Sequence, residues 1–71
     1  MLLVEKVRKE KGWSQAALSR QSSLHTSTVC GIERGRVVPY PAQRAKIAAA
    51  LEWPLDRADE LFEEVDDGDR D

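Results

Sequence analysis

Three consecutive short hydroxyl side chains, Thr26, Ser27 and Thr28, form the most distinctive polar group of the sequence. A hydroxyl can hydrogen-bond to any base type or to phosphate, and its short side chain permits close approach. Upstream of them, Ser14 has the residue type of a helix N-cap. The free N–H groups at such a helix start favour an anion such as phosphate. These residues therefore suit ligand binding rather than bond-breaking chemistry.

The sequence offers no catalytic or metal-binding constellation. His25 and Cys30 are the only histidine and the only cysteine, and they lie on the same expected helix. No phosphate-cradling glycine-rich loop is present either, so we expect neither an enzyme nor a cofactor. For Cys30 a buried, inert thiol is favoured over a redox sensor. A single unpaired thiol also fits a reducing cytoplasm.

The charge of the chain is divided between two unequal parts. The formal net charge is -2 over 71 residues, which by itself argues against a nucleic-acid partner. Residues 1–51, however, hold nine Lys and Arg against three Asp and Glu, a balance of +6. Residues 52–71 hold two basic side chains against ten acidic ones, a balance of -8. The small net charge thus conceals a basic part, residues 1–51, and an acidic part, residues 52–71.

Apolar residues recur at helical spacing along most of the chain, beginning with Leu3, Val4 and Val7. Gly12 and Gly35 are suited to ending helices, and the prolines near residue 40 interrupt the pattern. The expected helices span residues 3–11, 15–21, 25 or 26 to 34, 42–51 and 55–62.

The chain is expected to form one small all-α domain. Residues 1–62 carry the helices, whereas residues 63–71 are expected to be an acidic, disordered tail. No segment reaches the roughly 20 apolar residues of a membrane span, and the start does not have the pattern of a signal peptide. We therefore expect a cytoplasmic protein with no membrane partner and no small-molecule ligand.

Four short motifs follow one another in order. They are Val7-Arg8-x-x-x-Gly12, Ser14-Gln15-x-x-Leu18, Ser27-Thr28-Val29-x-x-Ile32-Glu33-x-Gly35-x-x-x-Pro39 and Ile47-Ala48-x-x-Leu51. Together they resemble the lambda-repressor-like, Cro/Xre-type helix-turn-helix family, over residues 4 to about 62. The resemblance implies a compact five-helix DNA-binding domain whose second and third helices form the helix-turn-helix.

The resemblance also implies which residues meet DNA. The recognition helix, about residues 25–34, would enter the major groove with Thr26, Ser27 and Thr28 at the base edges. Gln15 corresponds to a family position that contacts phosphate and sometimes a base, beside the helix start capped by Ser14. Further phosphate contacts are implied around the next loop, although a solvated basic face is the alternative there. Those candidates are Arg34, Arg36, Arg44 and Lys46.

Two positions depart from the family pattern. His25 stands where relatives often carry a better N-cap, so either the helix starts at Thr26 or His25 binds a phosphate. Gly31 stands where relatives often carry a long polar side chain that contacts a base. The glycine either removes that contact or permits closer approach of the backbone, which puts the sharpness of sequence specificity in question.

Other residues have structural explanations. The resemblance implies that Arg8 pairs with Glu33. A structural role of this pair is favoured over DNA contact, because an unpaired Glu33 would repel phosphate. Trp13 and Trp53 could stack on bases, but core positions are favoured because relatives carry apolar core residues there.

The favoured function is a sequence-specific regulator that binds double-stranded DNA as a homodimer on a pseudo-palindromic operator. The dimer contact is expected near the fifth helix, at Trp53, Leu55, Leu61 and Phe62. The alternative is a protein-interaction module, antitoxin-like or adaptor-like, with weak or vestigial DNA binding. The acidic tail either keeps the protein soluble or competes with DNA for the basic face.

Overall fold

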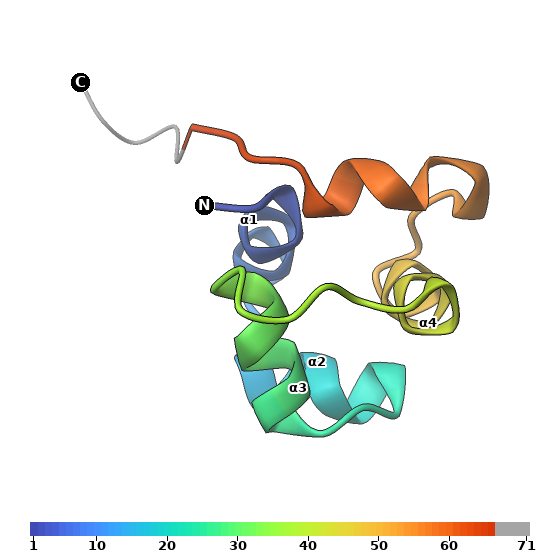
Figure 1. Ribbon diagram of the computed structural model, residues 1–71. Coiled ribbons are helices and arrows are strands. Elements are labelled where there is room, and N and C mark those ends of the chain that lie inside the picture. Colours follow the sequence, from blue (N-terminus) through green and yellow to red (C-terminus); the bar gives the residue numbers. More distant parts are fainter. Residues whose placement is uncertain (67–71) are drawn as a thin grey trace.

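The computed structural model describes residues 1–66 and consists of five helices arranged around one core (Figure 1). They are α1 (Leu3–Glu10), α2 (Gln15–Ser22), α3 (Thr26–Glu33), α4 (Pro41–Ala50) and the 3-10 helix η1 (Leu55–Phe62). Within residues 1–66 the extended structure is limited to one isolated antiparallel bridge between Leu2 and Glu64. The all-α, five-helix fold expected from the sequence is confirmed. None of the described helices is long and apolar enough to cross a membrane.

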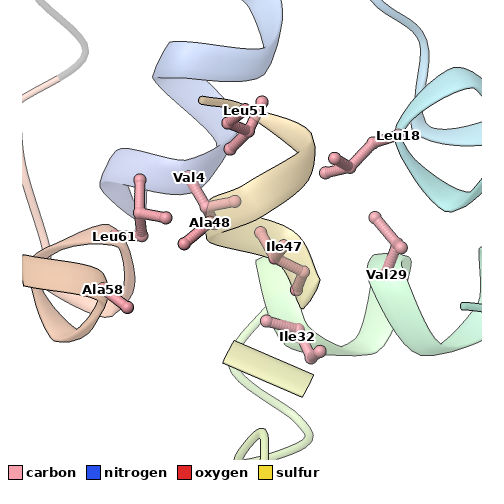
Figure 2. Close-up of a cluster of buried hydrophobic side chains, with 9 residues drawn as sticks. All are labelled: Val4, Leu18, Val29, Ile32, Ile47, Ala48, Leu51, Ala58 and Leu61. Atoms are coloured by element: carbon pink, nitrogen blue, oxygen red, sulfur yellow. The ribbon is translucent and has the colours of Figure 1, made fainter. Parts of the chain in front are cut away.

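Every helix contributes to a single apolar core (Figure 2). Figure 2 shows Ile47 and Ala48 of α4 in the middle of the cluster. Accordingly α4 packs against both α2 and η1, while α2 packs against α3 and α1 against η1. Trp13 and Trp53 are half-buried and pack against this core. The buried apolar residues are Val4, Leu18, Val29, Ile32, Ile47, Ala48, Leu51, Ala58 and Leu61.

Each of the four α-helices ends at a residue with left-handed backbone dihedrals. After this residue the next N–H reaches back to a carbonyl in the last turn, as in the Leu24 N to Ser19 O bond of 3.0 Å. Two of these positions were expected from glycine, whereas a serine and a glutamate occupy the other two. The four residues are Gly12 (φ 76°), Ser23 (φ 62°), Gly35 (φ 77°) and Glu52 (φ 58°).

The helix starts follow the local chemistry of the sequence. Ser14 caps α2, because its Oγ accepts a 3.0 Å hydrogen bond from the N–H of Ala17. His25 occupies the N-cap position of α3 without a capping hydrogen bond, so α3 starts at Thr26. Helix α4 starts at Pro41, one residue earlier than expected. Proline fits the first helical position, where its missing N–H has no intrahelical partner to lose.

The first residues after η1 contact the amino-terminal residues. Glu63 O accepts a hydrogen bond from Leu3 N at 3.0 Å, and Val65 N donates to Met1 O at 2.8 Å. The Met1 ammonium also pairs with Glu64 Oε1 at 3.2 Å. These contacts tie residues 63–65 to the amino-terminal residues of the chain. The rest of the expected tail, residues 67–71, lies outside the described residues.

The four residues expected at a dimer contact near the fifth helix differ in exposure. Leu61 has no exposed surface, since it lies in the core, and it is therefore removed from that contact. Trp53 and Phe62 are half-buried, while Leu55 is 62% exposed. Leu55 is thus the most accessible of the four residues expected at a subunit contact.

Candidate nucleic-acid interface

The first turn of α3 presents polar side chains while its other side is anchored. His25, Thr26 and Ser27 are exposed and Thr28 is half-buried. Farther along the same helix, Val29 and Ile32 are each 1% exposed and lie in the core. The core contacts therefore hold α3 by one side and leave its polar N-terminal end accessible to a ligand.

The hydroxyl of Thr26 is hydrogen-bonded to α2. Ser19 Oγ lies 3.0 Å from Thr26 Oγ1 and donates its own hydrogen to Ala16 O at 2.7 Å. A hydroxyl has one hydrogen to donate, so Thr26 must be the donor to Ser19. With its hydrogen used in this way, Thr26 Oγ1 can only accept further hydrogen bonds, through its two lone pairs. This hydroxyl suits a base amino group better than a phosphate, which offers no hydrogen.

Gln15, at the first position of α2, takes part in a hydrogen-bond network with α1 and α3. Its Nε2 donates to Glu33 Oε1 at 2.9 Å. Arg8 donates to the same carboxylate through Nε at 2.8 Å and Nη2 at 3.0 Å, which confirms the Arg8–Glu33 pair. Arg8 Nη1 also donates to Trp13 O at 2.8 Å. Glu33 is therefore a compensated charge, and the network joins α1 to both helices of the candidate motif.

Gln15 retains hydrogen-bonding capacity beyond this network. One of its two amide hydrogens is used by Glu33, so one hydrogen and the amide oxygen remain for a ligand. The contact with Glu33 was not predicted, because no sequence spacing signals a bond between the first residue of one helix and the last residue of the next. Holding the amide in place lowers the entropy that it would lose on binding.

Arg34 and Arg36 are the exposed cations at the end of α3. Within residues 1–66 no carboxylate lies within ion-pair distance of either guanidinium. Lys46 on α4 is also exposed and has no ion pair in this part of the chain. These three side chains can therefore approach an anion without first breaking an internal pair.

Arg44 is placed differently from the other predicted phosphate contacts. Its Nη1 donates to Pro39 O at 2.8 Å, and its Nε lies 3.1 Å from Asp59 Oδ1. It thus joins the loop before α4 to η1. These contacts favour a supporting role for Arg44 over direct contact with phosphate.

Gly31 faces the loop that follows α3. A Cβ atom at this position would lie 2.9 Å from Cγ2 of Val37, closer than real Cβ contacts. The glycine thus has a packing explanation that was not visible in the sequence, since Val37 lies beyond the helix end. The neighbouring Cys30 is half-buried.

Helices α2 and α3, which carry most of the candidate residues, lie away from η1, whereas Arg44 of α4 contacts Asp59 of η1. Figure 1 shows α2 and α3 together at one end and η1 at the other. The described acidic residues of the carboxyl-terminal part lie in or after η1, apart from Glu52. Residues 1–66 contain no group of three or more His, Cys, Asp or Glu side chains placed to hold a metal ion.

The comparisons with known proteins agree with this geometry. A family model described as a helix-turn-helix domain matches residues 3–61, which include all five helices except the last residue of η1. The search of curated proteins and the search of solved structures each gave no match.

Proposed function

Because this chain belongs to the helix-turn-helix domain family, we propose that it is a sequence-specific transcriptional regulator of bacterial or phage repressor and Cro-like type. The family makes it a DNA-binding regulator in general terms. The more specific proposal is that α3 enters the major groove of double-stranded DNA. It rests above all on the accessible polar start of α3, whose other side is anchored by Val29 and Ile32.

Direct base contact is assigned to the first turn of α3. Thr26 offers an oriented acceptor, which can accept a hydrogen bond from the amino group of adenine or cytosine. Ser27 is exposed and Thr28 half-buried beside it, and hydroxyls of this kind can pair with either base type. Short side chains bring the helix backbone close to the floor of the groove.

Phosphate contacts are assigned to both sides of that helix. Arg34 and Arg36 are exposed cations after α3, and His25 is exposed before it. The N-terminus of α2, with Ser14 as its cap and Gln15 as its first residue, adds a partial positive charge. Contacts of this kind set the position of the protein on the duplex without selecting a sequence.

The regulator is proposed to act in the cytoplasm as a homodimer on a pseudo-palindromic operator. A single module of this size buries limited surface on DNA, and two copies on two half-sites raise both affinity and specificity. Leu55 supports a contact near η1, since it is 62% exposed. Trp53 precedes this helix, Phe62 is its last residue, and both are half-buried.

Selection of bound duplexes from a random pool, followed by affinity measurements over a range of salt concentrations, tests the proposal. We expect an enriched palindromic motif and a log–log salt slope of about -0.9 per phosphate contacted. Arg36→Gln should make the slope less steep by about 0.9. The matched control is Arg57→Gln, because Arg57 lies on η1 and pairs with Glu60 at 3.0 Å; its slope should equal that of the wild type.

The second candidate is a protein-interaction module with weak or vestigial DNA binding. The favouring observation is the apolar surface of the loop after α3, where Val38 is 82% and Tyr40 71% exposed. The same experiment separates the two candidates. A wild-type protein that binds no duplex at low salt would support the interaction module and contradict the regulator.

A further inference from the structure

Gly31, which departs from the family pattern, lies against the side chain of Val37. A Cβ at residue 31 would lie 2.9 Å from Val37 Cγ2 and 3.6 Å from Val37 Cβ. Val37 is 42% exposed, so its side chain has space to move. A methyl group at position 31 would nevertheless displace the Val37 side chain from its present packing position against α3.

Backbone hydrogen bonds hold the same loop against the same residue. Gly31 O accepts from Arg36 N at 2.9 Å and from Val37 N at 3.2 Å. Gly35, which precedes these two donors, has left-handed dihedrals (φ 77°). They turn the chain back over the last turn of α3. Gly31 therefore has two roles. Its carbonyl accepts the hydrogen bonds from the loop, and its lack of a side chain leaves the space into which Val37 packs.

The far end of the loop is held as well. Pro39 is buried, and its carbonyl accepts the 2.8 Å hydrogen bond from Arg44 Nη1. Arg34 and Arg36 stand at the near end, exposed and without an ion pair within residues 1–66. A loop that is fixed at both ends presents these cations with little conformational freedom left to lose.

We propose that Gly31 is a positioning residue for DNA binding: its missing side chain seats Val37 on α3 and thereby fixes Arg34 and Arg36 for contact with phosphate. This inference rests on the function proposed above and deepens it. Position 31 acts through the loop and does not itself touch a base. The residue type that removes one possible base contact thus strengthens the contacts with the DNA backbone.

A double-mutant cycle tests the proposal with Gly31→Ala, Val37→Ala and the double variant, on the duplex selected by the wild type. Gly31→Ala should bind about tenfold more weakly, since overpacking displaces the loop. Val37→Ala removes the clashing methyl groups, and the double variant should then bind as tightly as Val37→Ala alone. The penalty of the alanine at position 31 should therefore depend on Val37.

Thermal unfolding provides a readout that needs no DNA. Alanine stabilises a helix relative to glycine, so the double variant should melt at a higher temperature than Val37→Ala. The same substitution should raise the melting temperature less, or lower it, when Val37 is present. If Gly31→Ala is unfolded, a folded double variant would still support the contact.

The remaining outcomes contradict the inference. An equal loss of affinity in both backgrounds would mean that Gly31 meets the DNA directly. Unchanged affinity in both backgrounds would mean that the seat of Val37 does not matter for binding. A wild-type protein that binds no duplex is a different result, because it removes the proposed function itself and the role of Gly31 with it.

Discussion

The guanidinium of Arg8 and the carboxylate of Glu33 form a bidentate ion pair, with Nε–Oε2 at 2.8 Å and Nη2–Oε1 at 3.0 Å. Their side chains are only 9% and 2% exposed. The pair joins α1 to the last residue of α3, and Gln15 adds a third polar contact from α2. Within residues 1–66, Arg8 is the one cation paired with Glu33, and this network links the candidate recognition helix to α1 and α2.

Breaking the Arg8–Glu33 pair on one side should be strongly destabilising. Glu33→Gln leaves a buried guanidinium without its counter-charge, so we expect a loss of about 3–5 kcal/mol in the free energy of unfolding. Arg8→Met/Glu33→Leu removes both charges and should cost much less. Urea titrations followed by circular dichroism measure all variants.

The control for this experiment is the exposed pair of Glu5 and Lys9 on α1, whose side chains are 24% and 56% exposed. Glu5→Gln should cost about 0.5 kcal/mol or less, because water screens such pairs. The interpretation is wrong if Glu33→Gln and Glu5→Gln have equal effects.

Glycine at the two left-handed helix ends that lack it should stabilise the domain. Ser23 and Glu52 have φ values of 62° and 58°, which are unfavourable for residues with a Cβ atom. Ser23→Gly and Glu52→Gly should each gain about 0.5–1 kcal/mol, the relief of this strain minus the larger entropy of glycine in the unfolded chain. The double variant should show the sum, and Gly35→Ala should show a loss. No gain at either site in thermal unfolding would contradict the argument.

The change in DNA affinity caused by Asp59→Asn distinguishes the two possible roles of Arg44. If Arg44 supports the loop through Pro39 and Asp59, Asp59→Asn should leave DNA affinity unchanged or lower it. If Arg44 instead contacts phosphate in competition with Asp59, the same substitution should raise affinity at low salt. We expect the first result, with a stability change below about 1 kcal/mol because Asp59 is 86% exposed. Asp56→Asn, on the same helix, removes an equal charge and serves as the control.

The contact between the chain ends predicts different effects for two truncations. Removing residues 63–71 deletes the hydrogen bonds to Met1 and Leu3, so the free energy of unfolding should fall by about 1–3 kcal/mol. Removing only residues 67–71 keeps those bonds and should change it by less than about 0.5 kcal/mol. Equal stability of the two truncated proteins would contradict a structural role for residues 63–66.

A test of whether the acidic segment competes with DNA needs a variant that preserves the backbone contacts. Glu63→Gln/Asp66→Asn removes two exposed charges and leaves the Met1–Glu64 pair in place. If the acidic residues compete with DNA for the basic face, the variant should bind more tightly at low salt, and the difference should vanish at high salt. Unchanged affinity at low salt would leave solubility as the simpler explanation of these charges.

The sequence determined the features that depend on near neighbours along the chain. Apolar spacing predicted the helices and the burial of Val29 and Ile32, and residue type predicted the cap at Ser14 and the helix ends at Gly12 and Gly35. These signals are local, because a helix satisfies its backbone bonds within a few residues. The pairing of Arg8 with Glu33 was also predicted, although through the family resemblance rather than through spacing.

Only the tertiary structure decided which polar groups compensate one another across the fold. The contacts of Gln15 with Glu33, of Arg44 with Asp59 and of Gly31 with Val37 all form after the chain has turned back on itself. The contact of residues 63–65 with the amino terminus is longer still in sequence separation. Such contacts depend on the exact path of loops and on angles between helices, which periodicity does not encode. The sequence therefore determined the helix-turn-helix, and the tertiary structure decided which of its polar residues remain free to meet DNA.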